Sequence, residues 1–69
     1  MSWCHEGRGM WRRVDGVLVE WCPIRLAWVA YHPDSVLVRR PGVGGSYPVV
    51  GKAAPEVMAV VDRLLPVTA

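Results

Sequence analysis

Apolar and polar residues alternate along most of the first forty positions of the chain, which is the pattern of half-buried β-strands. Turn segments interrupt the alternation at residues 15–16, 22–24 and 32–35. The Asp15-Gly16 pair between two valines favours a two-residue type I′ turn, and Pro23 and Pro33 are disfavoured inside a central strand. Residues 10–40 are therefore predicted to form a four-stranded antiparallel β-meander.

These turns also predict which residues share a face of the sheet. With a two-residue first turn, Val14 opposes Val17, and with a three-residue second turn, Trp21 opposes Arg25. Across the third turn, Tyr31 opposes Val36 and Trp28 opposes Arg39. The first face would then carry Met10, Val14, Val17, Val19, Trp21, Ala27, Val29, Tyr31, Val36 and Val38. The second face would carry Trp11, Leu18, Leu26, Trp28, Ala30 and Leu37, with Arg13 and Arg39 at its margins. Both faces are apolar, so one helix is too small to cover them both.

The end of the chain has the spacing of an amphipathic helix. Val57, Val60, Val61 and Leu64 recur at helical intervals, which predicts a helix over residues 55–65 with Asp62 facing water. Residues 1–9 are expected to be irregular. Residues 41–54 are expected to be a Gly/Pro loop in which residues 49–50 can form a short edge strand. The predicted fold class is α+β: a small four-stranded antiparallel β-meander followed by one C-terminal α-helix.

The composition indicates the origin and cellular compartment of the protein more than its activity. The 69 residues suffice for one domain, and a net charge of +2 does not demand a polyanionic partner. Arginine supplies seven of the eight basic residues, and Asn, Gln and Phe are absent, which indicates a GC-rich bacterial or phage genome. No apolar run has the length of a membrane span or of a signal peptide core. We therefore expect a cytoplasmic protein with reduced cysteines and no membrane partner.

Catalytic and cofactor motifs are incomplete in this sequence. Gly51-Lys52 resembles the end of a phosphate-binding P-loop, but Ser46 replaces its first glycine and Ala53 its hydroxyl residue. The zinc-ligand types Cys4, His5, Cys22 and His32 are present without a zinc-site spacing. We therefore expect no catalytic residues, no metal and no cofactor, and do not expect an enzyme.

The second face is the predicted functional surface, because Trp and Arg are enriched where proteins bind one another. Its predicted partner-binding residues are Trp11, Arg13, Leu18, Leu26, Trp28, Leu37 and Arg39. The predicted function is a non-catalytic protein-interaction module, an inhibitor or adaptor of bacterial or phage origin, with homo-oligomerisation as its simplest version. One alternative is a small β-barrel-like nucleic-acid-binding protein that uses Arg and Trp side chains. Another is that residues 1–9 or 41–50 fold back over this face.

Overall fold

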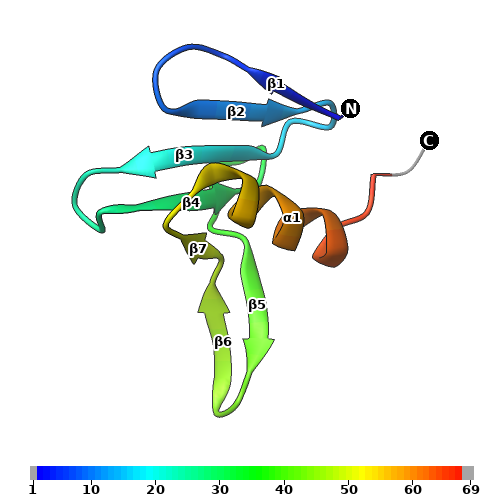
Figure 1. Cartoon of the computed structure of the whole chain (residues 1–69). Helices are drawn as coiled ribbons and strands as arrows, with labels where there is room; N and C mark the ends of the chain where they lie inside the picture. The colour runs from blue at the N-terminus through cyan, green and yellow to red at the C-terminus, as the bar shows by residue number, and fades with distance from the viewer. Residues whose placement is uncertain (1, 68–69) are drawn as a thin grey trace.

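The computed structural model describes residues 2–67, so Met1, the first residue of the predicted irregular segment, lies outside the described part. The elements are β1 (Trp3–His5), β2 (Met10–Arg13), β3 (Leu18–Cys22), β4 (Ala27–Tyr31), β5 (Arg39–Gly42), β6 (Gly45–Pro48), β7 (Val50–Gly51) and α1 (Ala54–Leu64) (Figure 1). The antiparallel sheet has the order β1-β2-β3-β4-β7, and β5 and β6 form a separate two-stranded sheet. The α+β class with one C-terminal helix is confirmed, but the sheet has five strands instead of four. The predicted fourth meander strand is not part of it, because Leu37 forms only an isolated bridge to Tyr31 and Arg39–Gly42 belongs to the second sheet.

The N-terminal segment is only partly irregular, because Trp3–His5 forms the edge strand β1 and pairs with β2, while residues 6–9 form the turn between the two strands. This strand extends the sheet sideways and does not fold over its second face. Residues 41–54 are not one loop either. The chain leaves the edge of β4 after Val38, forms the β5–β6 ribbon, and returns through Val49 to pair β7 with β4. The two segments proposed as covers of the second face therefore lie elsewhere.

The first turn differs from the predicted type I′ turn by one residue. The backbone N–H of Gly16 donates to the carbonyl of Arg13, and that of Arg13 donates to the carbonyl of Val17, which makes a three-residue connection. Only Gly16 has a positive φ, +97°, and the Asp15 carboxylate accepts the N–H of Val17. This is a type I turn with a glycine bulge, which needs one positive φ where type I′ needs two.

The third turn repeats this geometry. The backbone N–H of Ser35 donates to the carbonyl of His32, and Ser35 has a φ of +73°. The Asp34 carboxylate accepts the backbone N–H of Val36. The residue opposite Tyr31 is consequently Leu37 and not the predicted Val36. The second turn has four residues, 23–26, so that Cys22 pairs with Ala27. All three predicted turn registers are thus wrong by an odd number of residues.

An odd shift in register turns a strand over, because successive side chains point to opposite faces. Val17 and Val19 face the helix as predicted, but β2 and β4 are inverted relative to β3. Val19 therefore lies between Trp11 and Ala30 on the helix side. The opposite face carries Met10, Leu18, Cys22, Ala27, Val29 and Tyr31, and within residues 2–67 no helix lies on it.

The helix α1 packs on the side of the sheet formed by Val17, Val19 and Ala30. Its residues Val57 and Val61 are almost wholly buried there, so the predicted apolar stripe is confirmed. Pro55 lies in the first turn, where its missing N–H costs no hydrogen bond. The 11-residue helix begins and ends one residue earlier than predicted. Within residues 2–67, no helix is long and apolar enough to cross a membrane.

Candidate interaction site

Two tryptophans pack against each other at the end of the β3–β4 hairpin. Trp21 and Trp28 are cross-strand partners, with ring centroids 5.9 Å apart and planes at 67°. This edge-to-face arrangement is favourable beyond the burial of the two rings. Trp28 packs against the core, whereas Trp21 keeps 39% of its surface exposed. The pair thus presents one aromatic ring to solvent on a rigid base.

The four-residue turn beside this pair exposes two large aliphatic side chains. Ile24 is 93% exposed and Leu26 is 66% exposed, and the exposed Arg25 lies between them. Within residues 2–67, Arg25 forms no ion pair. We call the set Trp21, Ile24, Arg25, Leu26 and Trp28 the β3–β4 tip. An aliphatic side chain exposed to this extent contributes almost nothing to the stability of the free protein.

Leu26 also has a strained backbone. Its φ is +52°, in the left-handed region that costs a residue with a Cβ about 1–2 kcal/mol. Asn, Asp and Gly adopt this conformation more readily, yet the position holds a leucine with an exposed side chain. Folding therefore gains little from a leucine here. Backbone strain of this kind clusters at functional sites, although it also occurs in turns such as the one at Ser35.

A second aromatic pair extends this surface across the sheet. His5 and Trp11 are partners on β1 and β2, and their ring centroids are 4.7 Å apart. Trp11 opposes Val19, so Trp21 lies diagonally across from it on the same face. Side chains in this diagonal relation can reach each other when they are aromatic. The aromatic residues therefore follow one end of the sheet from β1 to β4.

The seven predicted partner-binding residues do not form one surface. Trp11, Arg13 and Trp28 share a face as expected, but it is the face that carries α1. Leu18 and Leu37 lie on the opposite face, on either side of Tyr31. The inverted strands β2 and β4 are the reason for this separation. Leu26 lies in the turn of the β3–β4 tip, and Arg39 lies in the separate β5–β6 ribbon. The predicted Trp28–Arg39 pair is replaced by Trp28 paired with Trp21 and Arg39 bonded to Ser46.

Arg13 is buried, with 2% of its surface exposed, and its charge is satisfied inside the protein. It donates to both oxygens of the Asp15 carboxylate and to Oδ1 of Asp62 on α1. Its guanidinium also lies 5.7 Å from the centroid of the Trp3 ring. The hydrogen bond to Asp15 is the main cause that raises the pKa of Arg13, and the same bond lowers the pKa of Asp15. Arg13 therefore links β2, the first turn and the helix, and is not available to a partner.

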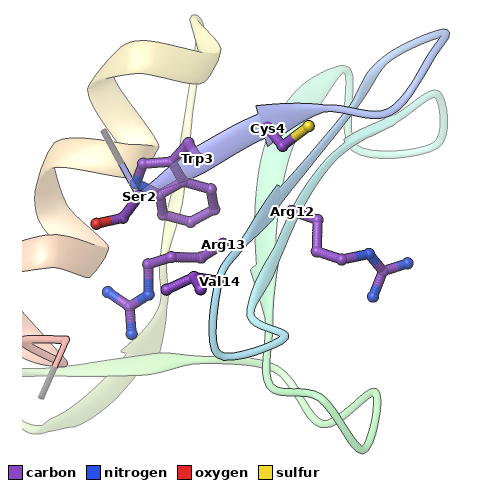
Figure 2. A pocket seen from close by; sticks show the side chains of 6 residues that line it. All are labelled: Ser2, Trp3, Cys4, Arg12, Arg13 and Val14. Atoms are coloured by element: carbon purple, nitrogen blue, oxygen red, sulfur yellow. The ribbon is translucent and has the colours of Figure 1, made fainter. Parts of the chain in front are cut away.

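A hollow of about 340 Å³ lies along the β1–β2 edge, lined by Ser2, Trp3, Cys4, Arg12, Arg13 and Val14. Figure 2 shows Trp3 and Arg13 on the side toward the helix, with Cys4 and Arg12 directed away from it. The hollow therefore follows the free edge of the sheet. Arg12 on this hollow forms an ion pair with Glu6. The thiol of Cys4, which also lines the hollow, is free and exposed.

The candidate zinc ligands are not brought together. Within residues 2–67, no three His, Cys, Asp or Glu side chains are grouped so that they could hold a metal ion. Cys4 and Cys22 are both free. The P-loop comparison also fails in structure, since Gly51 ends a short antiparallel strand, whereas a P-loop follows a strand of a parallel sheet.

Comparison of the chain with protein families, with curated proteins and with solved structures finds no match in any of the three.

Proposed function

We propose that this protein is a non-catalytic interaction module that inserts its β3–β4 tip into an apolar pocket of a partner protein. The observation that carries the proposal is the strained, 66% exposed Leu26 next to the 93% exposed Ile24. In the free protein, the backbone of Leu26 is strained and both apolar side chains are largely exposed to water, so neither residue favours folding. In a complex, each would contribute about 1.5–3 kcal/mol through the apolar surface removed from water.

The size of that gain points to a further residue in the interface. Association costs at least about 4 kcal/mol in lost motional freedom, so two aliphatic side chains alone give a weak complex. Trp21 adds a large, rigid side chain held by Trp28, and tryptophan is a frequent anchor of binding energy. We therefore place Trp21, Ile24 and Leu26 at the centre of the interface and Arg25 at its rim.

A partner of different sequence fits this site better than a second copy. The tip is the end of a hairpin (Figure 1), and a two-fold dimer would have to pack this end on itself and bring the Arg25 side chains of both copies close together. A protruding end instead suits a concave pocket with a carboxylate at its rim. The proposal keeps the setting indicated by composition: a bacterial or phage-encoded inhibitor or adaptor acting in the cytoplasm.

The test combines site-specific cross-linking with measured affinity. A photo-cross-linking amino acid at position 24 should capture one dominant protein from the lysate of a GC-rich bacterium. The same group at position 14 should not capture it, although Val14 is 75% exposed. With that protein purified, Ile24→Ala and Trp21→Ala should each weaken binding about tenfold or more, and Val14→Ala should not. Equal capture from both positions, or equal affinities, would contradict the proposal.

Leu26→Asn separates the role of the side chain from folding. Asparagine tolerates a positive φ, so the free protein should become more stable by about 0.5–1 kcal/mol. Binding to the partner should nevertheless weaken, because the apolar contact is lost. A variant that is more stable and binds equally well would show that Leu26 has no role in docking. A monomeric mass in solution is expected, and a tip-dependent homodimer would replace the proposed partner with a second copy.

A further inference from the structure

The β5–β6 ribbon is the part of the molecule that folding explains least. It projects away from the sheet and the helix (Figure 1), and none of its eight strand residues is buried. Its base is firm, because the flanking Val38 and Val49 are buried and the N–H of Val49 donates to the carbonyl of Val38. The ribbon thus adds little hydrophobic stabilisation to the fold, although its base is anchored in the core.

The ribbon is also internally braced, although isolated two-stranded hairpins are marginally stable. Arg39 donates from Nε to the hydroxyl of Ser46 and from Nη2 to the Ser46 carbonyl, each at a donor–acceptor distance of 2.8 Å. On the other face, the hydroxyl of Tyr47 donates to the carbonyl of Val43. The Tyr47 ring lies so close to Gly42 that a Cβ there would overlap it. The result is a thin, preformed strand pair.

Along the sequence, the positive charge of the chain is concentrated around this ribbon. Residues 35–55 contain three basic residues, Arg39, Arg40 and Lys52, and no Asp or Glu. The rest of the chain has five basic and six acidic residues, so this segment at +3 accounts for more than the whole net charge of +2. Within residues 2–67, none of its three cations forms an ion pair. These charges are therefore available to an anionic partner.

The ribbon is unsuited to strand addition, the usual way in which an exposed hairpin binds a peptide. Pro41 lies in one strand and Pro48 in the other, and each lacks the N–H that an added strand would need. A ligand must therefore meet side chains and the tip. Three of the ribbon's residues are glycines, which keeps it narrow, and the major groove of duplex DNA admits a two-stranded β-ribbon.

We propose that the β5–β6 ribbon binds duplex DNA, with the ribbon in a groove and Arg39, Arg40 and Lys52 on backbone phosphates. Arg40 opposes Tyr47 on one face of the ribbon, and Arg39 lies on the other face. The two arginines can therefore reach phosphates on the opposite walls of a groove. This inference is independent of the β3–β4 tip, because none of the tip residues takes part in it.

The experiment measures the affinity for a labelled random-sequence duplex by fluorescence anisotropy across a salt series. With three phosphate contacts, affinity should fall about 40-fold between about 50 and 200 mM salt. Arg40→Ala leaves two contacts, so it should bind more weakly and lose only about 12-fold over the same range. Arg8→Ala is the matched control, because it removes one exposed charge far from the ribbon in sequence and should behave like the wild type.

Three outcomes would overturn the proposal. The first is no binding to the duplex at the lowest salt concentration. The second is equal weakening by Arg8→Ala and Arg40→Ala, which would mean attraction by net charge alone. The third is binding to vesicles that contain phosphatidylserine without binding to DNA, which would assign the ribbon to a membrane surface. Thermal unfolding verifies that the variants are folded, and Arg40→Ala should leave the midpoint unchanged because no buried contact is lost.

Discussion

The guanidinium of Arg13 joins two segments that are 49 residues apart, because its Nη1 donates to Oδ1 of Asp62 over 3.1 Å. Trp3 donates from Nε1 to the same carboxylate. Asp62 was predicted to face water, and its side chain is partly exposed. It nevertheless connects the end of the helix to the two strands at the edge of the sheet. The connection has consequences for stability that distinguish Arg13 from its neighbour Arg12.

Arg13→Ala should destabilise the fold by about 2–3 kcal/mol. This is less than the loss for a wholly buried pair, because both carboxylates are partly exposed. Arg13→Met should recover part of the loss, since it restores apolar packing. Arg12→Ala is the matched control: its pair with Glu6 lies on the surface and should contribute less than about 1 kcal/mol. Urea denaturation of the three variants measures these differences, and equal losses for Arg12 and Arg13 would contradict the assigned roles.

Acid should weaken the fold through Asp15. The hydrogen bond from Arg13 lowers the pKa of Asp15 below its ordinary value of 3.8. A carboxyl whose pKa is lower in the folded state stabilises the fold above its unfolded pKa, and this stabilisation is lost as the pH falls through the folded value. The melting temperature should therefore fall below about pH 4. Asp15→Asn should flatten this part of the profile, and an unchanged profile in the variant would show that another group is responsible.

The two similar turns provide a pair of substitutions with opposite expected signs. Gly16→Ser should destabilise by about 1–2 kcal/mol, because the position has a φ of +97° and a Cβ there would lie 3.2 Å from Pro33. Ser35→Gly removes the Cβ from a residue with a φ of +73° and should stabilise by up to about 1 kcal/mol. Melting temperatures compare the two directly. Changes of the same sign would be inconsistent with the shared turn geometry.

Trp28→Ala should mainly reduce the free energy of unfolding, whereas Trp21→Ala should mainly reduce affinity for the partner. Trp28 packs against the core, so its loss should cost about 3 kcal/mol or more in folding. Trp21 is 39% exposed, so its truncation should cost clearly less in folding while weakening the partner complex. Chemical denaturation and binding titrations on the same two variants check this. Similar folding losses would mean that Trp21 belongs to the core and does not anchor the interface.

The sequence by itself determined the parts of this fold that depend on local pattern. Alternation identified three of the four predicted meander strands, β2, β3 and β4, and the helical spacing of Val57 and Val61 identified the buried stripe of α1. The turns were also located to within two residues, because Pro, Gly and Asp at those places disfavour continued strands. These features need only a few neighbouring residues.

Turn length and the placement of distant segments were decided only in the tertiary structure. Asp-Gly is compatible both with the predicted type I′ turn and with the observed turn in which only Gly16 has a positive φ, and the one-residue difference turns β2 over. That inversion directs Arg13 toward α1, where the Asp62 carboxylate accepts a hydrogen bond from its guanidinium. The register shift at the second turn inverts β4 and separates Leu18 from Trp28. An arginine with two acidic partners, one of them 49 residues away, can be buried, although its residue type predicts exposure. The exposure of Ile24 and the strain at Leu26 follow from the same cause, because a fourth residue in the second turn is what places them at the tip.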